Sequence, residues 1–178
     1  MSTIVNPRGA RKRPQNVAVA IASKPPGEPG ESTVRIRPVG RGDLDAVIQL
    51  DALVTGIEKL DYWNSLYHRY ANAVATGQHF LVAVAGDEVI GFVIGEVRDW
   101  EFGSPPCGWV FAIDVRPDVR LAGTATQLLK VICDGFRNAG VSKVRTMLSR
   151  DNALILSFFR SQGMMIAPFI PLEMDLGT

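Results

Sequence analysis

The chain has 178 residues, with 19 Lys and Arg against 18 Asp and Glu, a formal net charge of +1, and 47% apolar residues. This near-neutral balance argues against a nucleic-acid-binding domain, which normally carries a strong basic excess. The aliphatic content excludes wholesale disorder, and charge or glycine interrupts each apolar run before about 18 residues, so we expect no membrane-spanning helix. One compact domain with one sizeable core is the expectation at this length.

The cysteine and histidine content is low. Cys107 and Cys133 are the only cysteines, which excludes a disulfide scaffold and offers no spacing typical of a zinc site. We therefore expect two free thiols, no bound metal and a cytoplasmic protein. The two histidines, His68 and His79, are expected to serve packing rather than catalysis.

Residues 1–32 differ in composition from the rest of the chain. A basic cluster near the start is followed by the segment KPPGEPG over residues 24–30, whose prolines and glycines cannot continue a helix or a central strand. We expect a flexible tail here, with a basic arm that contacts acidic partners as the alternative. The folded domain is then expected over residues 33–178.

Hydrophobic periodicity and turn residues predict the elements of this domain. In chain order they are an edge strand over 34–39, helices over 43–53 and 62–75, a β-hairpin over 80–97, a buried strand over 109–115, a helix over 124–139, a strand over 143–148, a helix from Asn152 to Gly163, and a strand-like stretch over 164–176 broken by Pro168 and Pro171. This order predicts an α/β (α+β) fold with a mixed, mostly antiparallel sheet flanked by helices.

The loop after the buried strand is the most informative segment. It contains Arg120 and leads through small residues into a helix that begins at Gly123 or Thr124. Backbone N–H groups converge at such a helix start, where the helix dipole favours anions, and an arginine adds a bidentate phosphate partner. The loop therefore predicts a pyrophosphate cradle, although it has neither the Gly-Lys-Ser/Thr of a P-loop nor a G-x-G-x-x-G pattern.

Two spaced motifs together resemble the GNAT N-acetyltransferase family. They are V-x-P-x-x-R-x-x-G-x-A over Val115–Ala125 and N-A-x-x-x-x-F-F-x-x-x-G-M over Asn152–Met164. The resemblance covers residues 33–176 and implies a twisted sheet with a splayed central strand pair, with acetyl-CoA as co-substrate. A strand that parts from its neighbour leaves backbone groups that an amide-bearing ligand can satisfy. The cofactor-binding residues that the resemblance implies are Ile113, Asp114, Val115, Arg120, Leu121, Ala122, Gly123, Thr124, Ala125, Asn152 and Phe159.

The sequence departs from the family pattern at the residues that move protons. Phe159 stands where many members carry a tyrosine proton donor, and Met147 and Trp109 stand where members carry a glutamate base. The absence of this proton donor should slow the reaction little, because a thiol with a pKa near 8.5 leaves readily as the thiolate. Glu96, which closes an apolar strand, is the candidate base. Glu96 could instead be a solvated charge at the end of its strand. Asp114 and a chain of waters are the alternative candidates for the base.

These residues predict an acetyl-CoA-dependent N-acetyltransferase in which a primary amine of a small molecule or a protein attacks the thioester directly. A backbone amide near Val115 would polarise the thioester carbonyl. Without a committed base, weakly basic amines are the favoured acceptors. The alternative is a non-catalytic acyl-CoA-binding regulatory module. The acceptor amine is unidentified, no nucleic acid or membrane partner is expected, and the proline-broken segment 164–176 could pair across a homodimer.

Overall fold

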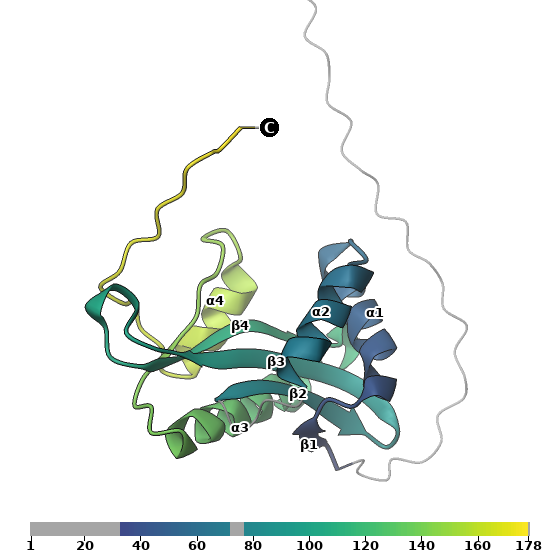
Figure 1. Cartoon of the computed structure of the whole chain (residues 1–178). Helices are drawn as coiled ribbons and strands as arrows, with labels where there is room; N and C mark the ends of the chain where they lie inside the picture. Colours follow the sequence, from purple (N-terminus) through teal and green to yellow (C-terminus); the bar gives the residue numbers. More distant parts are fainter. Residues whose placement is uncertain (1–32, 72–76, 178) are drawn as a thin grey trace, which may run out of the picture. The chain divides into compact units, whose positions relative to one another are not determined.

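The computed structural model describes residues 33–71 and 77–177, and the tail predicted over residues 1–32 lies outside them. The described chain folds around a five-stranded sheet in the order β1-β2-β3-β4-β5 (Figure 1). Strands β1 to β4 pair antiparallel with their neighbours, and β5 joins β4 in parallel. The predicted mixed, mostly antiparallel sheet is confirmed. The strands are β1 (Arg35–Pro38), β2 (Gln78–Ala85), β3 (Glu88–Arg98), β4 (Cys107–Val115) and β5 (Val144–Arg145).

Helices cover both faces of the sheet, since each carries an apolar stripe that must be buried. On one face lie α1 (Leu44–Thr55) and α2 (Leu60–Tyr70), and on the other lies α3 (Thr124–Asn138) (Figure 1). Helix α4 (Ala153–Ser161) packs into the same core as α3. Helix α2 begins at Leu60 rather than at Tyr62, and most of its predicted last turn lies outside the described residues. The connecting 3-10 helices are η1 (Arg41–Asp43), η3 (Glu101–Gly103) and η4 (Pro117–Ala122).

The sheet separates two apolar cores. Beneath α1 and α2, the Trp63 ring lies 6.0 Å from the Phe80 ring and 5.1 Å from the Phe92 ring, measured between centroids. On the other face, α3 buries Ile132 and Phe136 against the strands. Both faces of β3 are therefore covered, which makes β3 and β4 a rigid platform between two helical layers.

The strand expected over residues 164–176 does not form, and that prediction is wrong. The segment follows α4 as extended chain without strand pairing (Figure 1). Pro168 and Pro171 each remove a ladder donor, and β5, at two residues, is too short to template a neighbour. Six apolar side chains of this segment are 76–93% exposed, namely Met165, Ile166, Ile170, Leu172, Met174 and Leu176.

Candidate active site

The edge of β4 opens part-way along the strand. Near its start, β4 pairs with β5 at Gly108 and Trp109, and the Gly108 N–H donates to the Lys143 carbonyl at 2.9 Å. Phe111 then forms a β-bulge, because the register with β3 shifts between Ile94 and Gly95. From Val110 to Val115 no described strand pairs with this edge. The splayed strand pair implied by the family resemblance is therefore present.

Backbone directions along β4 show which groups the open edge offers. The Arg116 N–H donates to the Ile90 carbonyl on β3 at 2.9 Å. Because backbone groups alternate along a strand, Asp114 also faces β3, whereas the N–H and C=O groups of Ile113 and Val115 face the open edge. An extended, amide-bearing ligand can bind to this edge as an added strand would.

The loop that follows β4 presents the start of α3. Gly123, in the left-handed region at a φ of 78°, turns the chain out of η4 and into α3. Within the described chain no side chain caps the N-terminus of α3, so the N–H groups of its first turn are available to an anion. Leu121 and Ala122 end η4 beside this turn, and Thr124 and Ala125 open the helix.

Arg120 links the loop to the open edge. Its Nε donates to the Val115 carbonyl at 3.1 Å, which holds the guanidinium at the end of the strand. In the part of the chain that the structure describes, this is the hydrogen bond that Arg120 makes, so its terminal N–H groups remain available for phosphate. The structure thus brings the predicted loop residues and the predicted strand residues together.

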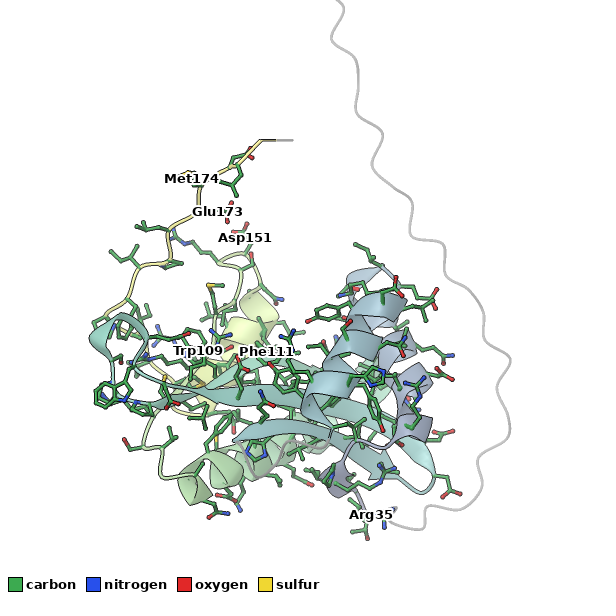
Figure 2. All side chains as sticks on the ribbon, in the orientation of Figure 1. Arg35, Trp109, Phe111, Asp151, Glu173 and Met174 are labelled. Atoms are coloured by element: carbon green, nitrogen blue, oxygen red, sulfur yellow. The ribbon has the colours of Figure 1, made fainter. Side chains whose placement is uncertain are left out.

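Glu96 lies on β3 beside the bulge, and its side chain is on the face of the sheet that carries α2. The Tyr70 hydroxyl donates to Oε2 of Glu96 at 2.6 Å, and Nε of Arg98 donates to Oε1 at 2.9 Å. Burial and the neighbouring carboxylate raise the pKa of Tyr70 to about 12. The Arg98 guanidinium also lies over the Trp109 ring, 4.9 Å from its centroid. Figure 2 shows Trp109 and Phe111 on this central part of the sheet, between α2 and α4.

A second charged group lies near the far end of β4. Asp51, 4% exposed, accepts from Trp63 Nε1 at 2.9 Å and forms an ion pair with Lys59 at 2.9 Å. Burial raises the pKa of the nearby Asp114 to about 6; the Asp51 charge adds to this rise, and Arg120 and Lys59 oppose it. This cluster joins α1, the α1–α2 loop and β4.

The predicted site residues of α4 contribute to capping and packing of the helix. Oδ1 of Asn152 accepts from the Ile155 N–H at 3.2 Å, which caps the N-terminus of α4. Phe159 is 4% exposed and packs in the core beside α3, so it holds α4 against the sheet. Met147 is 72% exposed. The described residues contain no group of three or more metal-binding side chains, and none of their helices has the length and hydropathy needed to cross a membrane.

Sequence reasoning missed the two side-chain clusters of this site. Tyr70 and Glu96 are 26 residues apart, and no local pattern relates a helix-end tyrosine to a strand-end glutamate. The link from Asp51 to Lys59 and Trp63 was missed for the same reason, although the three residues flank the predicted α1–α2 turn. A polar residue at a helix position that should be buried, as at Asp51, is the sequence signal that could have revealed this cluster.

Comparisons with known proteins agree with this geometry. A model of the acetyltransferase (GNAT) family matches residues 44–164. An L-2,4-diaminobutyric acid acetyltransferase of Nocardia farcinica (strain IFM 10152) is 33% identical over 79 residues, which are 44% of this chain and 39% of that protein. The match thus spans about two fifths of that relative's length.

Solved structures of similar fold include aminoglycoside acetyltransferases. The aminoglycoside N-acetyltransferase AAC(6')-Iy in complex with CoA has a TM-score of 0.73 and 20% identity, over 84% of this chain and 99% of its own. AAC(6')-Ih from Acinetobacter baumannii has a TM-score of 0.68 and 15% identity, over 82% of this chain and 100% of its own. At these identities the likeness establishes the fold.

Proposed function

The chain belongs to the acetyltransferase (GNAT) family, and from that premise we propose that it transfers the acetyl group of acetyl-CoA to a primary amine. The observation that carries this proposal is the open edge of β4 beside the uncapped start of α3. An acyl-CoA needs both features, because its pantetheine arm bears amides and its pyrophosphate bears charge.

The cofactor-binding roles that we propose are supported by this geometry. The backbone groups of Ile113 and Val115 would hold the pantetheine arm, and Asp114 between them, whose backbone faces β3, would keep this part of the strand in place. The loop from Arg120 to Ala125 would hold the pyrophosphate. Asn152 and Phe159 would act from α4, the first through the cap that fixes the start of the helix and the second through packing. In this scheme a backbone N–H of the open edge polarises the thioester carbonyl as an oxyanion donor does.

The reaction proposed is direct attack. The amine nitrogen bonds to the acetyl carbon, the C–S bond breaks, and CoA leaves as the thiolate. Phe159 cannot donate a proton, and with a thiol pKa near 8.5 the thiolate needs no donor in order to leave. We assign Glu96 as the acceptor of the amine proton through water, which its place beside the bulge and its 19% exposed side chain support.

Small amines are the first acceptors to test. The relative from Nocardia is named for a diamino acid, and the solved neighbours are named for aminoglycosides, so each of these proteins is named for an amino-bearing small molecule. A neutral amine is the nucleophile, and an ε-amine with a pKa near 10.4 is mostly protonated at neutral pH. Weakly basic amines therefore suit a site whose base acts through water.

Titration calorimetry of acetyl-CoA and CoA with the wild type and Arg120→Ala tests the cofactor site. We expect the acetyl-CoA Kd to rise about 10- to 100-fold in Arg120→Ala, because a charge-assisted phosphate contact is lost. Arg35→Ala removes the same charge from exposed β1 and should leave the Kd unchanged. Equal affinity in Arg120→Ala would remove Arg120 from the cofactor site.

An amine panel read out by free thiol then separates an enzyme from a regulatory module. CoA release with any amine is the expected result. Tight acetyl-CoA binding without release across the panel would favour the non-catalytic acyl-CoA-binding module, for which Phe159, Met147 and Trp109 would mark lost chemistry.

We also propose a homodimer in which the exposed segment after α4 is covered by a second copy. The support is the run of exposed apolar side chains beside β5, the edge strand of the sheet. Light scattering on the wild type and on Leu172→Asp tests this, since Leu172 is 93% exposed. A dimer that the substitution dissociates is expected, and a monomeric wild type would refute it.

A cytoplasmic location is proposed as well. Cys107 and Cys133 are both free thiols, as proteins of reducing compartments usually have. Fluorescence imaging of the full-length chain in its cell of origin tests the location, and secretion into the medium would refute it.

A further inference from the structure

Asp114 occupies a distinctive position on β4. Its sequence neighbours Ile113 and Val115 belong to the core beneath α3, and its partner on β3, Phe92, belongs to the core beneath α1 and α2. Because side chains alternate along a strand, the Asp114 carboxylate projects to the α1–α2 face. Its backbone lies between the two residues whose polar groups form the open edge. The carboxylate is thus one residue away from the backbone proposed to hold the thioester.

No side chain among the described residues donates a hydrogen bond or forms an ion pair with this half-buried carboxylate. Lys59 and Arg120, the two cations whose charges lower its pKa, form no bond to it. Lys59 pairs with Asp51 at 2.9 Å, and Arg120 donates to the Val115 carbonyl. Asp51 is in turn satisfied by Lys59 and by the Trp63 indole. Partial burial of a carboxylate without a bonded partner is costly, so a cation that bonded to Asp114 would be stabilised there.

The Glu96 carboxylate, unlike that of Asp114, has hydrogen-bond partners in the described part of the chain. Both of its oxygens already accept hydrogen bonds, one from Tyr70 and one from Arg98. It is also remote from Asp114, since Phe92, the partner of Asp114, lies four residues before Glu96 along β3, a separation of about 13 Å. A cation that enters the α1–α2 face near the open edge therefore meets Asp114 as the unsatisfied carboxylate.

We propose that the Asp114 carboxylate binds a second, protonated amino group of the acceptor, so that the preferred acceptor is a short diamine. The inference rests on the proposed function, because the first amino group is the one acetylated. Adjacent Cα atoms are about 3.8 Å apart, so the amine at the open edge and the ammonium at Asp114 belong to one small molecule. An acceptor with a single amine would leave the carboxylate unpaired. Asp114 acts here as a specificity-determining residue, and Glu96 keeps the proposed role in proton transfer.

The test compares 1,3-diaminopropane with propylamine in the wild type and in Asp114→Asn. In the wild type, kcat/KM for the diamine should exceed that for the monoamine by about 10- to 100-fold, as for one charge-assisted contact. In Asp114→Asn the ratio of diamine to monoamine kcat/KM should fall about 10- to 100-fold, because any difference in the basicity of the two amines is the same for both proteins. Asp87→Asn is the matched control, because Asp87 is an exposed residue of the β2–β3 turn, and it should keep the preference. A diamine to monoamine ratio that is unchanged in Asp114→Asn, or no preference in the wild type, would overturn the proposal.

A pH profile adds a readout that a structural role would not produce. The pKa of Asp114 is raised to about 6 by burial, with Asp51 adding to the rise and Lys59 and Arg120 opposing it. Diamine kcat/KM in the wild type should therefore fall more steeply than monoamine kcat/KM as the pH drops through about 6. In Asp114→Asn the two profiles should be parallel, and parallel profiles in the wild type would contradict the assignment.

Binding without turnover separates this inference from the proposed function. Calorimetric titration of 1,3-diaminopropane into the wild-type CoA complex should show binding that Asp114→Asn loses. If acetyl-CoA binds and amines are acetylated, yet no diamine binding depends on Asp114, this inference alone fails. If acetyl-CoA does not bind, the proposed function fails, and a diamine that still binds at Asp114 in the CoA-free protein would support the cation site.

Discussion

The hydroxyl group of Tyr70 donates a 2.6 Å hydrogen bond to Oε2 of Glu96, which ties the end of α2 to β3. Arg98 donates to the second oxygen of the same carboxylate and lies over the Trp109 ring. The position of Glu96 beside the bulge therefore depends on two donors from two different elements. A carboxylate fixed in this way is suited to order a water between itself and an incoming amine.

Tyr70→Phe should lower both stability and rate. Loss of a hydrogen bond to a charged group costs about 1.5 to 3 kcal/mol of unfolding free energy. We expect kcat to fall about 10-fold as Glu96 loses one of its donors, with the acetyl-CoA Kd unchanged. Denaturant titration and steady-state kinetics measure the two effects. Tyr67→Phe, on the same helix, serves as the control, and an equal loss of kcat in both variants would contradict a positioning role for Tyr70.

Thr124→Val should stabilise the protein. The Thr124 hydroxyl is fully buried and has no hydrogen-bond partner among the described residues, so its replacement by a methyl group removes an unsatisfied polar atom. The expected gain is about 1 kcal/mol in the free energy of unfolding. Because the proposed phosphate contact uses the backbone N–H, the acetyl-CoA Kd should stay the same. A weaker Kd would show instead that the hydroxyl takes part in binding.

The close approach at Gly95 should make this position intolerant of a side chain. A Cβ there would lie 2.9 Å from Cζ of Phe136, 3.0 Å from Cδ1 of Ile132, and closer still to the Trp109 carbonyl. Gly95→Ala should cost about 1 to 3 kcal/mol of stability, because β4 and α3 must both move. Acetyl-CoA binding should weaken with it, since the bulge sets the open edge. Gly42→Ala meets nothing within 4 Å and should be near neutral in thermal unfolding.

His79 should make stability depend on pH below neutrality. The ring is 6% exposed and packs against Phe136, and burial lowers the pKa of His79 below its ordinary value of 6.5. The unfolded chain therefore binds a proton more readily than the folded chain, and stability is lost as the pH falls below about 6.5. We expect the free energy of unfolding, measured by denaturant titration, to decrease between pH 7 and pH 5.

Substitution of each histidine isolates this effect. His79→Leu should flatten the dependence of stability on pH in that range. His68 is exposed on α2, so His68→Gln should retain it. An unchanged pH dependence in His79→Leu would assign the effect to other groups.

The order of elements and the cofactor loop could be predicted from the sequence because their signals are local. Pro117 ends a strand pattern, Gly123 takes a positive φ just before α3, and the β2–β3 hairpin turns at Gly86 and Asp87. Each signal acts through the backbone of a few consecutive residues. The same local logic was wrong for residues 164–176, because a strand needs a neighbour and β5 is two residues long.

What the sequence by itself determined is therefore the family, the order of elements along the chain up to β5, and the loop and strand that would hold a CoA ester. The tertiary structure alone decided which side chains lie beside the bulge and the open edge of β4. Tyr70 meets Glu96 across 26 residues of chain, and Asp51 and Lys59 lie near Asp114 through packing of α1 and its following loop on the sheet. The physical reason is the sequence distance over which each feature is set. Turn and strand signals depend on a few neighbouring residues, whereas the burial and pairing of a charge depend on elements that only folding brings together.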